Sequence, residues 1–247
     1  MNQLVELAWE DTQLPYNEWC SLDQLWLYIA RKSQEFAISY CYAEARTAKW
    51  LQFTDLKETR YPGAGTLQAS AGLSTRPVVA RPTQPLHLPR GEHLTLFVGT
   101  TLWFCLRRNN EPLLDLPLEL LSDTWFGPDT RVGEVCYASP THARLTMDGV
   151  PRHVFKAVTP VEIRNQSHVP LLIDKLNLPV PYLALYRDAH RHWTSQVTIT
   201  QTSEQQRGEI HISPGPPHHA KFPVDVAPPR RKLEGGMLHK AMSLLLG

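Results

Sequence analysis

The residues with the greatest capacity for chemistry lie close together near the middle of the chain. Two adjacent aromatic residues, Trp125 and Phe126, stand among three charged ones, Asp123, Arg131 and Glu134. Aromatic rings beside a carboxylate and a guanidinium are typical of pockets that stack a ligand ring and hold its polar groups. The structural alternative is that the rings fill one end of a β-sandwich while Asp123 caps a turn. Both interpretations stay open, and these five are the candidate binding residues.

A second candidate is the pair His190 and His192. On a strand, residues two apart point to the same face, as metal sites in some β-barrels require. The surrounding sequence, Asp188-Ala-His-Arg191, instead indicates a hairpin turn before Trp193, and no third ligand can be identified. We therefore expect both histidines to be exposed to solvent, and we predict no metal or other cofactor.

Sequence motifs of several enzyme classes are absent. There is no Gly-x-Ser-x-Gly elbow, no phosphate-binding loop ending in Gly-Lys-Ser/Thr and no His-Glu-x-x-His. Gly63 and Gly65 lack the third glycine of a dinucleotide-binding fingerprint. We therefore predict no catalytic residues and a non-enzymatic protein, while a metal-dependent enzyme stays the third hypothesis.

Composition limits the class of protein further. Lys and Arg number 25 and Asp and Glu 24, so no excess of positive charge attracts nucleic acid. No segment reaches the roughly 18 apolar residues that a membrane span needs, and the acidic N-terminus does not resemble a signal peptide. We therefore expect a cytoplasmic protein without a transmembrane segment, with peripheral association with the inner membrane as an open alternative.

The cysteines agree with this compartment. Their spacing includes no Cys-x-x-Cys pair, which argues against a zinc site or a redox motif. Cys41, Cys105 and Cys136 lie in apolar, strand-like runs, so we expect buried free thiols.

Short alternating segments separated by turn residues predict an all-β fold. Residues 24–43 alternate as a hairpin would, although the apolar spacing over 19–30 also fits a helix. Further segments of this kind follow as far as residue 212, at the spacing that is typical of β-sandwiches. We predict two packed antiparallel β-sandwich units, residues 1–158 and residues 159–213.

The last part of the chain has a different pattern. Residues 214–235 contain six prolines and the basic run Arg230-Arg-Lys232, and predict a linker. Leu238, Ala241, Met242 and Leu245 fall at helical spacing, which predicts a short amphipathic helix over 236–247. A helix of about ten residues is unstable alone in water. It would dock on its own sheet, on an anionic membrane or in a partner's groove.

Four motifs carry a family resemblance. They are the aromatic segment around Trp125, Gly133-Glu-Val-Cys-Tyr137, Ile163-Arg-Asn-Gln-Ser167 and Leu183-Ala-Leu-Tyr186. Together they resemble the domain of unknown function 432 (DUF432) family of bacteria and archaea, over most of residues 90–213. The resemblance implies genes that often lie beside those of small-conductance mechanosensitive channels, and it implies no catalytic or binding residues.

The leading hypothesis is therefore an accessory or interaction protein. Its partner would be a membrane channel or another protein, bound through the C-terminal tail. The alternative is a carbohydrate-type binding β-sandwich that uses Trp125 and Phe126.

Overall fold

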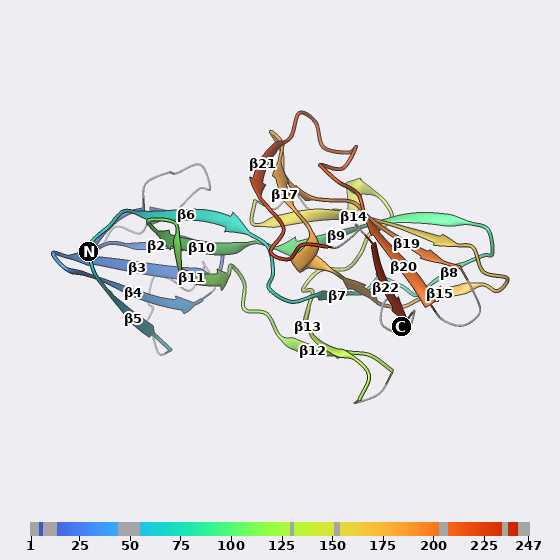
Figure 1. Cartoon of the computed structure of the whole chain (residues 1–247), viewed down its shortest axis with the longest axis horizontal. Helices are drawn as coiled ribbons and strands as arrows, with labels where there is room; N and C mark the ends of the chain where they lie inside the picture. The colour runs from blue at the N-terminus through green and yellow to red at the C-terminus, as the bar shows by residue number, and fades with distance from the viewer. Residues whose placement is uncertain are drawn as a thin grey trace. The chain divides into compact units, whose positions relative to one another are not determined.

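The protein consists almost entirely of β-strands (Figure 1). The computed structural model describes residues 5–6, 14–43, 55–128, 131–150, 154–202, 207–233 and 237–241. In these ranges the helical elements are two single 3-10 turns, η2 (Met147–Gly149) and η3 (Val180–Tyr182). The predicted all-β class is confirmed.

The chain divides into two compact units. Unit 1 comprises Met1–Gly72 and Leu102–Leu120, and unit 2 comprises Leu73–Thr101 and Leu121–Gly247. This division differs from the one predicted, because the expected boundary at residue 158 falls inside a single ten-residue strand, β14 (Lys156–Asn165).

Unit 1 contains a five-stranded sheet of order β1-β2-β3-β4-β5 and a three-stranded sheet of order β11-β10-β6. The strands are β1 (Val5–Glu6), β2 (Trp19–Leu22), β3 (Leu25–Lys32), β4 (Glu35–Tyr42), β5 (Lys57–Pro62), β6 (Leu67–Gly72), β10 (Trp103–Arg108) and β11 (Glu111–Pro117). The predicted hairpin over 24–43 is confirmed, with β3 and β4 in register from Leu25 opposite Tyr42 to Lys32 opposite Glu35. The competing helix over 19–30 does not form, because β2 pairs with β3 there.

Unit 2 is organised around β14. This strand pairs antiparallel with β9 along its length, parallel with β18 through its first residues and parallel with β19 through its last. The large sheet has the order β21-β17-β18-β14-β19-β20-β22 with β9 joined to β14, and it is therefore mixed, where the sequence predicted antiparallel pairing. Its strands besides β14 are β9 (His93–Thr101), β17 (Leu185–Arg187), β18 (His192–Thr194), β19 (Val197–Gln201), β20 (Arg207–Ile212), β21 (Val224–Ala227) and β22 (Met237–Ala241).

Two smaller sheets complete unit 2. One has the order β12-β13-β7-β16 and the other pairs β15 with β8. Their strands are β7 (Val78–Ala80), β8 (Leu86–Leu88), β12 (Asp123–Phe126), β13 (Glu134–Ala138), β15 (Leu171–Ile173) and β16 (Leu176–Leu178).

The predicted C-terminal helix is wrong over the residues that the structure describes. Met237–Ala241 form strand β22, which pairs antiparallel with β20 from Met237 opposite His211 to Ala241 opposite Arg207. A helix of this length is unstable on its own, whereas pairing with the edge of β20 gives the same residues interstrand hydrogen bonds. Residues 242–247 lie outside the described ranges. The predicted linker over 214–235 likewise contains β21, which pairs with β17.

The cysteines carry no disulfide. Cys20, Cys41 and Cys136 are buried and Cys105 is half-buried. Burial raises the pKa of the Cys20 thiol to about 12, so this cysteine stays in the unreactive thiol form at neutral pH.

A fully buried asparagine, Asn165, is the last residue of β14 and forms four side-chain hydrogen bonds. The amide of Asn165 donates to the carbonyl oxygens of Leu88 (3.0 Å) and Val169 (2.8 Å). Its side-chain oxygen accepts from the backbone N–H (3.1 Å) and the hydroxyl (2.7 Å) of Ser167. One side chain therefore ties β8, the end of β14 and the following turn together.

We expect Asn165→Ala to lower the free energy of unfolding by about 2 kcal/mol, because buried backbone groups lose their partners. Urea denaturation followed by circular dichroism measures this, with the exposed neighbour Gln166→Ala as the control. An Asn165→Ala protein with the unfolding midpoint of the control would contradict the role of this network.

Candidate functional site

The segment predicted as an aromatic loop is a β-hairpin. β12 pairs antiparallel with β13, so that Trp125 lies opposite Val135 and Phe126 opposite Glu134. The turn begins at Gly127, where an added Cβ would lie 2.2 Å from the backbone oxygen of Val132. Only glycine fits this approach of the two strands.

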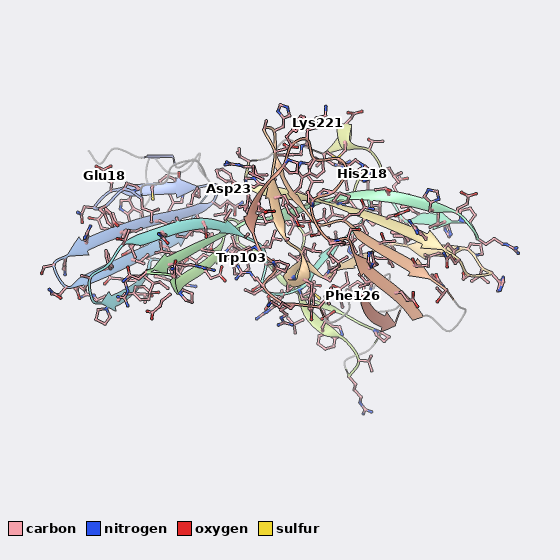
Figure 2. All side chains as sticks on the ribbon, turned by 45° about the horizontal axis from the view of Figure 1, so that its top comes forward. Glu18, Asp23, Trp103, Phe126, His218 and Lys221 are labelled. Carbon is pink, nitrogen blue, oxygen red and sulfur yellow. The ribbon has the colours of Figure 1, made fainter. Side chains whose placement is uncertain are left out.

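The two aromatic residues have opposite environments. Phe126 is fully buried and packs with Val79 and Cys136, and the Lys175 ammonium lies 4.9 Å from its ring centroid. Trp125 is 45% exposed. Adjacent residues on a strand point to opposite faces of a sheet. The structure therefore separates the two rings that the sequence grouped into one site (Figure 2 labels Phe126).

The charged candidates divide in the same way. Glu134 accepts a hydrogen bond of 2.7 Å from the amide of Asn177, beside the buried Cys136. Asp123, on the face of Trp125, forms an exposed ion pair of 3.1 Å with Arg76. Arg131 is exposed in the hairpin turn. Phe126 and Glu134 thus belong to the buried face, and Asp123 and Trp125 to the exposed one.

The exposed face of the hairpin is apolar at its centre. Trp125 and Val135 lie opposite one another on β12 and β13 and are each 45% exposed, and Val132, in the turn between the strands, is 48% exposed. A Cβ added at Gly133 would lie 2.7 Å from two carbons of the Trp125 indole, so the indole rests directly on the backbone of the hairpin. The ring is therefore held in place while one side of it faces solvent.

The histidine pair does not form a site. His190 is exposed in the turn, as predicted, but His192 lies on β18 and is only 3% exposed. The prediction of exposure was wrong for His192 because the turn ends one residue earlier and β18 enters the core. In the described parts of the chain, no group of three or more His, Cys, Asp or Glu side chains is arranged to hold a metal ion.

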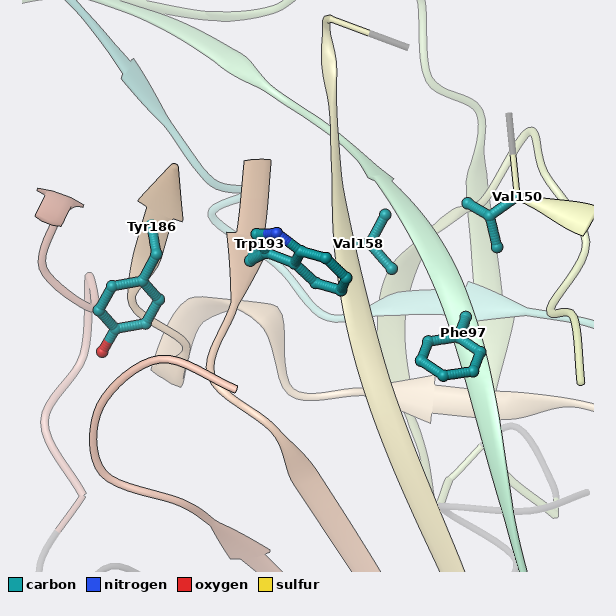
Figure 3. Packing of buried hydrophobic residues seen from close by; sticks show 5 residues of the cluster. All are labelled: Phe97, Val150, Val158, Tyr186 and Trp193. Carbon is teal, nitrogen blue, oxygen red and sulfur yellow. The ribbon is translucent and has the colours of Figure 1, made fainter. Parts of the chain in front are cut away.

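No sequence motif indicates the cavity of about 200 Å³ in unit 2. Its lining residues are Gly99, Pro140, Thr141, His142, Arg144, Val150, Lys156, Val158 and Arg191. Four of these nine residues are basic and none is acidic. The nine residues come from four separate segments of the chain. Figure 3 shows Val158 and Trp193 on neighbouring strands, Phe97 on β9, and Val150 on the segment that follows β13. A basic cluster of this kind leaves no motif, because only the register of β9, β14 and β18 brings its members together.

Comparison with known families covers nearly the whole chain. The model of a family described as "Protein of unknown function (DUF432)" matches residues 8–245. The chain belongs to the DUF432 family. The resemblance predicted over residues 90–213 is thus confirmed and extends into both units. No curated protein and no solved structure matches the chain.

The sequence motifs of this DUF432 protein have structural roles in unit 2. Asn165 and Ser167 form the buried network at the end of β14, and Leu183, Leu185 and Tyr186 are buried in the core. Trp125, in the aromatic segment, and Val135, in the Gly133–Tyr137 motif, both present apolar side chains to solvent. Among the described residues, none forms a helix with the length and apolar character required to cross a bilayer.

Proposed function

We propose that this DUF432 protein is a non-enzymatic accessory protein that binds a protein partner through the exposed face of the β12–β13 hairpin. The observation that carries the proposal is the half-exposed cross-strand pair formed by Trp125 and Val135. Tryptophan is enriched at the energetic centres of protein interfaces, where its large ring buries apolar area at low entropic cost.

The position of β12 supports a particular mode of binding. β12 is the terminal strand of its sheet in the described part of the chain. An extended partner segment that adds to such an edge gains backbone hydrogen bonds, and its alternate side chains contact one face of the sheet. Trp125 and Val135 would anchor these side chains, and the Arg76–Asp123 pair and Arg131 would form the polar rim.

The partner that we propose is the cytoplasmic face of a small-conductance mechanosensitive channel, as the family resemblance implies. A cytoplasmic location, peripheral to the inner membrane, belongs to the same proposal. We place the docking site on the hairpin and not on the C-terminal tail, because residues 237–241 of the tail are part of the large sheet.

Co-purification tests this proposal. The full chain is mixed with the detergent-solubilised channel, and we expect a complex whose affinity falls on the order of tenfold or more in Trp125→Ser. Leu172→Ser is the matched control, because Leu172 is 46% exposed on β15, in another sheet of the same unit. It should bind as the unchanged protein does.

Two results would contradict the proposal at different points. No complex between the unchanged protein and the channel would remove the channel as partner. A complex that Trp125→Ser and Leu172→Ser weaken equally would remove the hairpin as the docking surface.

The carbohydrate-binding alternative rests on the same exposed ring. It loses its second ring, because Phe126 is buried and unable to stack on a sugar. Saturable binding of an oligosaccharide that Trp125→Ser abolishes, together with no recovered protein partner, would favour this alternative.

A further inference from the structure

The cavity of unit 2 collects positive charge around a small volume. His142 and Arg144 reach it from the segment after β13, Lys156 from the start of β14, and Arg191 from the turn before β18. Its lining contains no aspartate or glutamate. The side chains of Arg144, Lys156 and Arg191 are cationic, and in a partly enclosed space they attract an anion more strongly than in open water.

The wall formed by Gly99 and Thr141 is built into the fold. Thr141 approaches β9 so closely that a Cβ at Gly99 would lie 2.9 Å from its hydroxyl oxygen. The Thr141 hydroxyl donates to the carbonyl of Gly99 at 3.2 Å. Further along the segment, Arg144 exchanges two backbone hydrogen bonds with Phe97, of 2.7 and 3.0 Å. The segment that carries His142 and Arg144 is therefore attached to β9 at two points.

Arg191 is also held in position. Its guanidinium carbon lies 5.6 Å from the ring centroid of Trp193, and its backbone N–H donates to Asp188 at 2.9 Å. The Asp188 carboxylate also accepts hydrogen bonds from the Trp193 indole and from the backbone of His190 and Lys221. Partial burial alone would raise the pKa of Asp188, but these four hydrogen bonds outweigh it and lower the pKa. The nearest carboxylate in sequence thus orders the turn through backbone N–H groups.

We propose that this cavity binds the phosphate group of a small phosphomonoester. The directional donors of Arg144 and Arg191 and the compact charge of Lys156 suit a tetrahedral dianion with oxygens on all sides. A second, more open hollow of about 630 Å³ shares Val150 and Arg191 with the cavity. Its other lining residues are polar or aromatic for the most part and include Asp148, Asp188, His190, Trp193, His219 and Lys221. It provides room for the organic part of the ligand, so a phosphomonoester fits better than inorganic phosphate.

Calorimetric titration of the full chain tests the proposal with three probes, glycerol 3-phosphate, inorganic phosphate and succinate. Glycerol 3-phosphate should bind at one site per chain, more tightly than the other two, and more weakly as salt is added. Lys156→Gln and Arg144→Gln should each weaken binding roughly tenfold or more. Lys156→Arg keeps the charge and should retain most of the affinity.

The matched control is Arg164→Gln. Arg164 lies on the same strand and the same face as Lys156, but outside the cavity, in an ion pair of 2.9 Å with Glu162. Thermal unfolding without ligand verifies that each variant folds. The proposal is overturned if no probe binds, or if Lys156→Gln binds as Arg164→Gln does. Equal affinity for succinate overturns the phosphate assignment, and equal affinity for inorganic phosphate overturns the role of the hollow.

Discussion

Replacing Phe126 with alanine is expected to lower the free energy of unfolding by about 3–5 kcal/mol. The side chain is fully buried against Val79 and Cys136, so its removal leaves a cavity as well as losing apolar burial. The loss also removes the aromatic face beneath the Lys175 ammonium. Urea denaturation, followed by circular dichroism and tryptophan fluorescence, measures the change.

The neighbouring residue provides the control. Trp125 is 45% exposed, so Trp125→Ala should cost only about 1 kcal/mol or less, although its ring is larger. Comparable losses for the two variants would show that both rings are buried. The assignment of Trp125 to the exposed face of the β12–β13 hairpin would then be wrong, and so would the docking surface proposed there.

The stability of the protein should also depend on the protonation of His192. This side chain is 3% exposed, and burial, with a smaller contribution from Arg187, lowers its pKa from 6.5 to about 4. A hydrogen bond with the backbone of Val154 and the charge of Asp188 oppose this shift without cancelling it. Between these two pKa values the unfolded chain binds a proton that the folded chain does not.

The free energy of unfolding should therefore fall as the pH is lowered from about 6.5 to about 4, by about 3 kcal/mol in total. Above the higher value both states hold neutral histidine, and this residue adds no pH dependence. Urea denaturation at a series of pH values measures the slope.

A matched pair of variants isolates this histidine. His192→Gln should remove the acid-dependent loss of stability, whereas His190→Gln, in the exposed turn beside it, should leave the loss unchanged. An identical slope in both variants would mean that other groups cause the acid sensitivity.

The strands could be predicted from sequence wherever local alternation and turn residues agree. The hairpin of β3 and β4 is an example, because its apolar residues and the turn at Ser33-Gln34 lie within one short segment. The same local reasoning was wrong for the C-terminus. Leu238 and Ala241 fit helical spacing, yet Met237–Ala241 pair with β20. Pairing with a distant strand supplies hydrogen bonds that no local pattern records.

The candidate site shows the same limit. The sequence identified the Trp125–Phe126 pair as unusual, and its motifs placed the chain in the DUF432 family. Which of the two rings faces solvent depends on the register of β12 with β13. A shift of one residue in that register would exchange the two faces.

The amino-acid sequence was therefore sufficient for the all-β class, for the family and for the strands that short-range periodicity marks. The folded structure was needed for the exposed face around Trp125 and for the basic cavity. Arg144, Lys156 and Arg191 come from three separate segments, which the bridge between Phe97 and Arg144 and the pairing of β14 with β9 and β18 bring together. Such pairings join residues of large sequence separation, and a local pattern contains no information about them.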